Sequence, residues 1–126
     1  MATPAAARAE AAAVADLPFK IDLPAGFEVT PRPRGPDFIV FDVVKGADSY
    51  VGVYVGGFAS FPMHKDLKVE GRGGGLKVAL RDGRPVEYLW FRETGWPTQL
   101  HVWIQVGADA DPAIADRIAA SIGFAP

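Results

Sequence analysis

The feature that most constrains this chain is a two-residue alternation of apolar and other side chains, which recurs in several segments. It is clearest between residues 98 and 106, where aliphatic positions alternate with polar or aromatic ones. The aliphatic set is Leu100, Val102, Ile104 and Val106, and the intervening set is Gln99, His101, Trp103 and Gln105. Successive side chains of a β-strand point to opposite faces, so this pattern predicts a strand with one buried face.

Two earlier segments are also predicted to be strands. In residues 17–29, Phe19, Ile21 and Leu23 alternate with charged residues before a turn that contains proline and glycine. Residues 37–44 are largely apolar on both faces, which predicts a central strand covered on two sides. The connection between these segments cannot be a central strand, because it contains three prolines: Pro31, Pro33 and Pro36.

A third predicted strand, residues 49–58, has two contrasting faces. Val51, Val53 and Val55 form the aliphatic face. The opposite face combines aromatic residues with interleaved glycines, which let another backbone or a ligand approach closely. Its members are Tyr50, Gly52, Tyr54, Gly56 and Phe58.

A β-hairpin is predicted between Leu76 and Phe91, with its turn at Asp82–Gly83. Two registers compete. A two-residue turn places Glu87 opposite Val78, whereas a three-residue loop, 81–83, pairs Val78 with Val86 and Lys77 with Glu87. We expect the second register, with Gly83 in the left-handed region, because it gathers apolar residues on one face. These are Leu76, Val78, Leu80, Val86, Tyr88 and Trp90.

The chain ends in a segment typical of an amphipathic helix. Asp111 is a good N-cap, Pro112 suits the first helical position, and Gly123 is placed to terminate the helix. The apolar stripe consists of Ile114, Ala115, Ile118, Ala119 and Ile122. Together these elements predict an α+β fold, in which an antiparallel sheet of about six strands packs against a C-terminal helix. We expect one domain over residues 17–126.

Residues 1–16 are rich in alanine and form a separate segment. Two interpretations stay open: a short alanine-driven N-terminal helix, or a loose leader left after cleavage of an export signal encoded upstream. No apolar run in the sequence reaches the 18 or more residues that a membrane helix needs. If the leader interpretation holds, the protein is periplasmic or exported, and a cytoplasmic location is the alternative.

Composition and motifs exclude several classes of function. A net charge of −2 argues against a nucleic-acid binder, and the absence of cysteine removes disulfides, thiol nucleophiles and iron–sulfur clusters. The glycine cluster 71–75 precedes a strand, so it is predicted to be a mobile surface loop instead of a phosphate loop. Neither histidine lies in a metal-binding motif, and no serine lies in a nucleophile elbow. We expect no cofactor, no metal and no catalytic residue.

The feature that best indicates a binding site is aromatic: predicted strands 49–58 and 98–106 each carry aromatic residues on the face opposite their aliphatic residues. If the two faces coincide, they form an aromatic, partly polar surface of the kind enriched at interfaces. The alternative is that the alanine-rich N-terminal segment covers this face. The predicted binding residues are Tyr50, Tyr54, Phe58, His101 and Trp103.

Two stretches resemble a known group of proteins. Residues 19–29 (FKIDLPAGFEV) and 118–124 (IAASIGF) are similar to the ends of PsbP-like and DcrB-like bacterial domains. The resemblance implies an antiparallel sheet between helices, and proteins that are often exported or lipid-anchored. Some relatives act as chaperones or assembly factors, and no catalytic residue is implied.

Three classes of function follow, in order of preference. The first is a non-catalytic protein-binding or assembly module of an exported bacterial protein. The second is an immunity or adaptor protein that neutralises or escorts one partner. The third is a small enzyme with an unrecognised site built from Asp42, Glu87, Arg92 and His101, although Glu87 is expected to form an ion pair with Lys77 instead.

Overall fold

The structure, a computed structural model, describes residues 14–33, 35–106 and 110–126. It contains two helices and nine strands within those residues. In chain order they are η1 (Val14–Asp16), β1 (Phe19–Lys20), β2 (Glu28–Pro31), β3 (Ile39–Lys45), β4 (Asp48–Gly56), β5 (Lys68–Gly73), β6 (Leu76–Arg81), β7 (Arg84–Phe91), β8 (Gln99–Ile104), α2 (Pro112–Ser121) and β9 (Gly123–Phe124).

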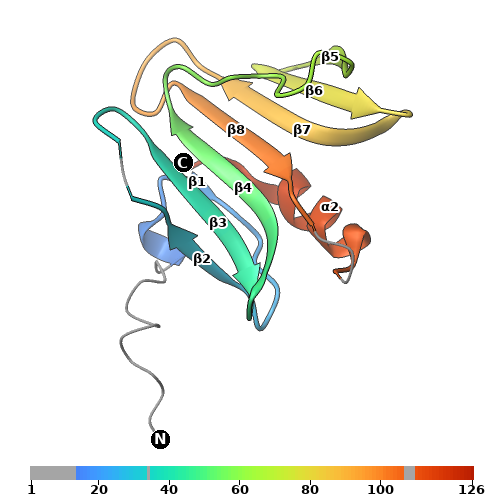
Figure 1. The fold of residues 1–126 in the computed structure, drawn as a ribbon. Helices are drawn as coiled ribbons and strands as arrows, with labels where there is room; N and C mark the ends of the chain where they lie inside the picture. Colours follow the sequence, from blue (N-terminus) through green and yellow to red (C-terminus); the bar gives the residue numbers. More distant parts are fainter. Residues whose placement is uncertain (1–13, 34, 107–109) are drawn as a thin grey trace, which may run out of the picture.

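The architecture is a seven-stranded antiparallel sheet with one α-helix packed on one of its faces (Figure 1). The strand order is β2-β3-β4-β8-β7-β6-β5, so β8 is inserted between β4 and β7. Helix α2 contacts β4, β7 and β8 at the middle of the sheet. The predicted α+β class and the C-terminal helix are confirmed.

The core lies between α2 and the aliphatic face of the sheet. Val51, Val53, Leu100 and Val102 are fully buried there, and Ile118 of the helix is 1 % exposed. The side chain of Asp111 accepts a hydrogen bond from the N–H of Ala113, as expected of an N-cap. The aliphatic faces of β4 and β8 therefore pack against the apolar stripe of α2, and the predicted cap begins the helix.

The C-terminus differs from the expectation at Gly123. Instead of closing the helix in a left-handed conformation, Gly123 and Phe124 form β9, which pairs with β1 in a separate two-stranded sheet. Lys20 is opposite Gly123, and Phe19 is opposite Phe124. This pairing brings the end of the chain beside residue 19, far away in sequence, which local pattern cannot anticipate.

Two strands of the main sheet are absent from the sequence prediction, and both lie at its edges. β2 falls partly in the proline-rich connection, where Pro31 ends an edge strand, as prolines are known to do. β5 falls partly in the glycine cluster, for which a mobile loop is the wrong prediction. Gly71 and Gly73 belong to this strand, and Gly74–Gly75 form a two-residue turn into β6 with positive φ angles.

The predicted hairpin register is wrong. Arg81 pairs with Arg84 across a two-residue turn, in which Asp82 and Gly83 have φ of 54° and 78°. A β-bulge then shifts the register, so that Ala79 faces Glu87 and Val78 faces Tyr88. Without a bulge, a two-residue turn would put Glu87 opposite Val78. The extra residue avoids this unfavourable pair. The left-handed conformation of Gly83 is confirmed.

The N-terminal prediction falls almost entirely outside the described residues. Of the segment 1–16, only Val14–Asp16 is described, as one turn of 3-10 helix. Among the described residues, no helix combines the length and hydropathy that crossing a bilayer requires.

Candidate functional site

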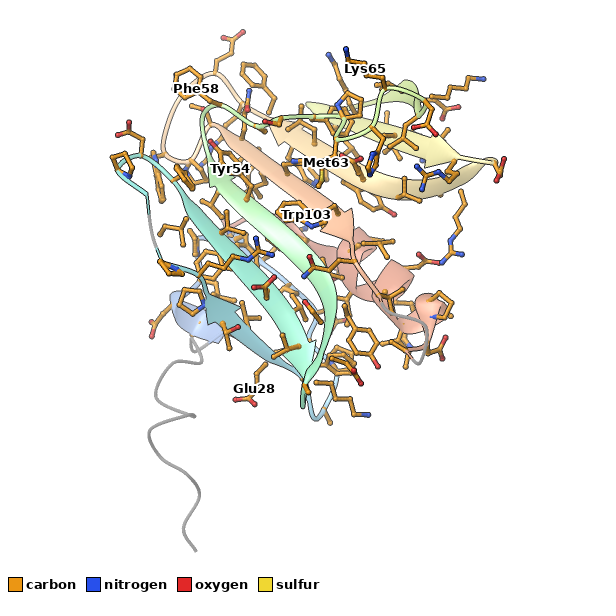
Figure 2. All side chains as sticks on the ribbon, in the orientation of Figure 1. Glu28, Tyr54, Phe58, Met63, Lys65 and Trp103 are labelled. Atoms are coloured by element: carbon orange, nitrogen blue, oxygen red, sulfur yellow. The ribbon has the colours of Figure 1, made fainter. Side chains whose placement is uncertain are left out.

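The face of the sheet opposite α2 carries the predicted aromatic surface. In the register of β4 and β8, Gly52 is opposite Trp103 and Tyr54 is opposite His101. Because side chains alternate along a strand, Tyr54, His101 and Trp103 share one face. Figure 2 shows Tyr54 and Trp103 on the side of the sheet away from α2. The aromatic faces of the two strands therefore coincide.

Gly52 makes room for the ring of Trp103. A Cβ atom at position 52 would overlap the indole, so the ring lies directly over the glycine backbone. Gly56 plays a similar part for Tyr54, whose hydroxyl oxygen would be 2.6 Å from an added Cβ. The aromatic rings therefore occupy the space that a side chain at Gly52 or Gly56 would need.

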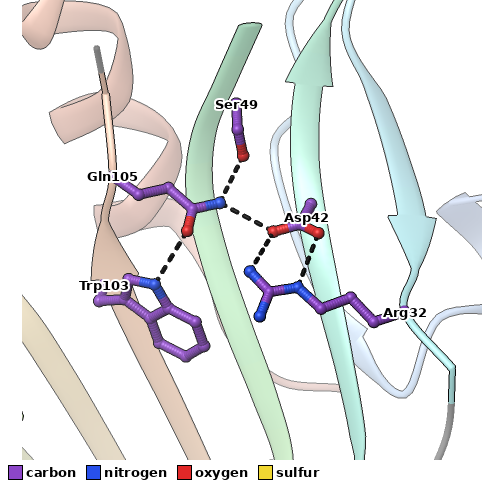
Figure 3. A network of polar contacts seen from close by, with 5 residues as sticks. All are labelled: Arg32, Asp42, Ser49, Trp103 and Gln105. Atoms are coloured by element: carbon purple, nitrogen blue, oxygen red, sulfur yellow. Dashed lines mark hydrogen bonds and ion pairs between the residues drawn. The ribbon is translucent and has the colours of Figure 1, made fainter. Parts of the chain in front are cut away.

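A polar network fixes the orientation of Trp103 (Figure 3). Its Nε1–H donates to Oε1 of Gln105 at 3.0 Å, and Nε2 of Gln105 donates to Oδ1 of Asp42 at 2.8 Å. Gln105 also contacts Ser49. Arg32 completes the network with two hydrogen bonds to Asp42, from Nε at 2.9 Å and from a terminal nitrogen at 2.8 Å.

The electrostatics of this network are those of a structural ion pair. The hydrogen bonds from Arg32 lower the pKa of Asp42 below its ordinary value, against the opposing effect of burial, and the amide of Gln105 lowers it further. Asp42 in turn raises the pKa of Arg32. Since Asp42 is an ionised acceptor with its oxygens already in use, it is poorly suited to act as a general acid.

The connection between β4 and β5, residues 57–67, crosses the same face and is called the strap below. Three backbone N–H groups hold it to the sheet. That of Phe58 donates to the hydroxyl of Tyr54 at 3.0 Å, that of Ala59 to Oε1 of Gln99 at 2.8 Å, and that of Met63 to Oε1 of Glu87 at 2.9 Å. The strap therefore covers part of the aromatic face, whereas the predicted cover by the N-terminal segment lies almost entirely outside the described residues.

Beneath the strap lies a buried pair of titratable residues. Glu87 and His101 are each 3 % exposed, and Nε2 of His101 lies 2.7 Å from Oε1 of Glu87. A carboxylate oxygen only accepts, so the imidazole tautomer that carries its proton on Nε2 is the one that donates to Oε1 of Glu87. Burial lowers the pKa of His101 and outweighs the opposing effect of Glu87, so the imidazole is neutral near pH 7.

Two predicted binding residues are placed differently from the expectation. A β-bulge makes Tyr50 an extra residue between Val51 and Ser49, which turns its ring into the core against Phe27, with ring centroids 4.9 Å apart. Tyr50 therefore does not lie on the aromatic face. Phe58 lies beyond the end of β4, on the strap, and is 87 % exposed.

Of the four residues proposed for an enzymatic alternative, the structure brings together Glu87 and His101 but places Asp42 and Arg92 elsewhere. Glu87 pairs with His101 and not with Lys77, which faces Leu89. Asp42 forms an ion pair with Arg32. Arg92 stacks on the ring of Phe124, with its guanidinium carbon 4.2 Å from the ring centroid. In the parts of the chain that the structure describes, no three His, Cys, Asp or Glu side chains are close enough together to bind a metal ion.

The accessible part of this face consists of two hollows on either side of Met63 and Trp103. The smaller has a volume of about 170 Å³. It is lined by Tyr54, Phe58, Ser60, Met63, His101 and Trp103. The larger, of about 500 Å³, extends from Met63 and Trp103 towards the β6–β7 turn, where Arg81 and Arg84 line it.

Sequence reasoning missed Met63 and Phe38 as members of this surface. Phe38 stacks on Tyr54 with ring centroids 5.7 Å apart, and Met63 is 48 % exposed on the strap. Phe38 could have been found, because it lies on the non-core face at the start of a predicted strand. Nothing local in the sequence indicates that residue 63 lies over the sheet, since that depends on how the strap folds back.

An open antiparallel sheet with one face covered by a helix and the other partly covered by aromatic residues and a strap defines an α+β protein. No family model, curated protein or solved structure matches the chain.

Proposed function

We propose that the protein is a non-catalytic binding module, which holds a protein partner on an aromatic face made of Tyr54, Phe58, Met63 and Trp103. The observation that carries the proposal is the exposure of Phe58 and Met63 on a strap tied down by backbone hydrogen bonds. Large apolar side chains held rigidly at the surface lose little conformational entropy on binding, and aromatic residues often dominate binding energy.

The smaller hollow, beside Phe58, favours one inserted side chain of a protein partner, whereas the adjoining hollow of about 500 Å³ has the volume of a small-molecule site. The volume of the smaller hollow, about 170 Å³, is below the range of roughly 300–1,000 Å³ that is typical of small-molecule sites. It suits one inserted side chain of a larger partner. Glu87 and His101, each 3 % exposed, border the two hollows and are hydrogen-bonded to each other, an arrangement that supports a structural role under the strap.

The proposed module belongs to an exported bacterial protein, a location supported by the resemblance of residues 19–29 and 118–124 to exported domains. Cell fractionation of the product of the complete gene tests the location. Recovery in the cytoplasm alone would contradict it.

Site-specific photo-crosslinking tests the binding face. A photoreactive amino acid replaces Phe58 in cells that express the protein, and a matched variant carries it at Val69, which is 43 % exposed on edge strand β5. We expect a discrete protein adduct from position 58 and none of the same mass from position 69. Identical adducts from both positions, or none from position 58, would contradict the proposal.

With the partner identified, titration of purified proteins measures the contribution of the face. Phe58→Ser should weaken binding by about tenfold or more, the equivalent of about 1.4 kcal/mol. Val69→Ser should leave it unchanged. The double variant Tyr54→Ala/Trp103→Ala should also weaken binding, provided that its circular dichroism shows a folded sheet.

A further inference from the structure

The outer edge of β5 is the second feature of this fold that suggests a partner. Within residues 14–33, 35–106 and 110–126, no strand pairs with that edge, although β5 ends the main sheet. Five of its six residues are exposed, and Val69 is 43 % exposed. The opposite edge, β2, is blunted by Pro31, whereas β5 contains no proline.

The register shows which backbone groups of β5 are free. Gly73 and Leu76 flank a two-residue turn, so Leu76 exchanges hydrogen bonds with β5. Because backbone groups alternate in direction along a strand, the N–H and C=O groups of Val78 and Leu80 also point to β5. Their partners Glu70 and Lys68 therefore direct their own N–H and C=O groups towards β6. The N–H and C=O of Val69, between them, point to the open edge.

The charges along this edge alternate in sign. Asp66, Lys68, Glu70 and Arg72 all line one hollow, which places them on one face of the hairpin. The order is negative, positive, negative, positive, and Val69 lies at its centre. Read in the opposite direction, the order of charges is positive, negative, positive, negative. An antiparallel second copy of the segment therefore offers an opposite charge at Lys68 and at Glu70.

We propose that β5 pairs antiparallel with β5 of a second copy of the chain, about a twofold axis at Val69. In this register Lys68 lies opposite Glu70 of the second copy, and this pair occurs twice. Asp66 lies in the turn before β5, and Arg72 lies at a β-bulge in an ion pair with Glu70 of its own chain, so both are outside the regular pairing. The backbone of Val69 exchanges both hydrogen bonds with its symmetry mate. The two sheets join edge to edge into one continuous sheet.

Charge selects this register over its nearest competitor. Centring the pairing on Glu70 places Glu70 directly opposite Glu70 of the second copy. Like charges directly opposite each other destabilise paired strands. Charged edges usually prevent pairing, because a chance partner offers no matching charges. Here the matching partner is the chain itself.

The interface is one short strand, so the dimer should be weak and sensitive to salt. Sedimentation velocity of the wild-type protein from about 10 μM to 1 mM should show a concentration-dependent shift from monomer to dimer, reduced at high salt. A monomer throughout this range would overturn the proposal.

Charge reversal tests the register. In Lys68→Glu and in Glu70→Lys, each copy meets like charges, and dimerisation should weaken at least tenfold. An equimolar mixture of the two variants should form a heterodimer, because one chain is then negative at both positions and the other is positive at both. Circular dichroism confirms that each variant is folded. Dimers of unchanged strength in both variants, or a mixture that stays monomeric, would overturn the register.

Val69→Pro tests the role of the backbone. The N–H of Val69 points to the open edge, so proline removes no hydrogen bond to β6 and the monomer should stay folded. Dimerisation should be lost. As a control, Val69→Thr keeps the N–H and should retain the dimer. A proline variant that dimerises like the wild type would show that the contact lies elsewhere.

Discussion

At the scale of single residues, glycine and histidine decide how the aromatic face is built. Gly52 is required because the indole of Trp103 occupies the space that a Cβ would need. His101 is on the same face but is buried under the strap, where its partner is Glu87. Gly52 and His101 thus have structural roles. From the sequence alone, these roles cannot be told apart from roles in binding.

Gly52→Ala should destabilise the fold by about 1–3 kcal/mol, since the added methyl group forces the Trp103 ring from its place. Displacement of the ring should also break its hydrogen bond to Gln105 and change the tryptophan fluorescence. Urea unfolding measures the free energy. Gly71→Ala is the matched control, because an added Cβ there meets no atom within 4 Å. Equal effects of the two substitutions would contradict this explanation.

His101 should make stability depend on pH. Burial depresses its pKa in the folded state below the ordinary 6.5, so the unfolded chain binds a proton first as the pH falls. The stabilisation is therefore complete above pH 6.5 and is lost as the pH falls from there through the folded pKa.

Urea midpoints measured between about pH 7.5 and pH 5 test this dependence. We expect the midpoint of the wild type to fall over this range, and that of His101→Gln to fall less. His64→Gln should behave like the wild type, because His64 is exposed. If His64→Gln removes the slope and His101→Gln does not, the assignment to the buried ring is wrong.

At the scale of elements, the helix and the hairpins differ in how far local pattern determines them. Helix α2 begins at the predicted cap, and its apolar stripe faces the sheet, because 3.6-residue periodicity and capping are local properties. The β6–β7 hairpin has the predicted turn residues but a different register, because a bulge at Val86 shifts the strand and Glu87 hydrogen-bonds to His101.

Ile118→Ala should lower the free energy of unfolding by roughly 2–5 kcal/mol, because it removes a fully buried side chain from the helix–sheet contact. Arg117→Ala, a neighbouring exposed position in the same helix, should change it by less than about 0.5 kcal/mol. Chemical denaturation measures both variants. A loss below about 1 kcal/mol for Ile118→Ala would mean that the helix contributes little to the core.

At the scale of the whole molecule, the two ends of the described chain are joined. β1 pairs with β9, and the N–H of Asp22 donates to the hydroxyl of Ser121 at 3.0 Å. Phe124 also contacts the ring of Trp90, with centroids 6.4 Å apart. The C-terminal residues therefore hold β1 in place, although β1 lies near the other end of the sequence.

Deletion of residues 123–126 should destabilise the protein by about 1–3 kcal/mol, through the lost burial of Phe124 and its contact with Arg92. Amide hydrogen exchange should accelerate at Phe19 and Lys20, the partners of β9. Deletion of Ala125 and Pro126 alone, which leaves β9 in place, is the control. Unchanged exchange at β1 in the longer deletion would contradict this role.

Local sequence patterns predict the α+β class, the C-terminal helix with its cap, and the aliphatic faces of β4 and β8. All of these depend on periodicity and capping, which act over a few residues. Tertiary contacts set the two edge strands, the β4–β8 pairing that puts Tyr54 and Trp103 on one face, the bulges that bury Tyr50 and shift Glu87, and the strap that covers His101. Those outcomes depend on contacts between distant segments, and adding one residue to a strand reverses the faces of all that follow.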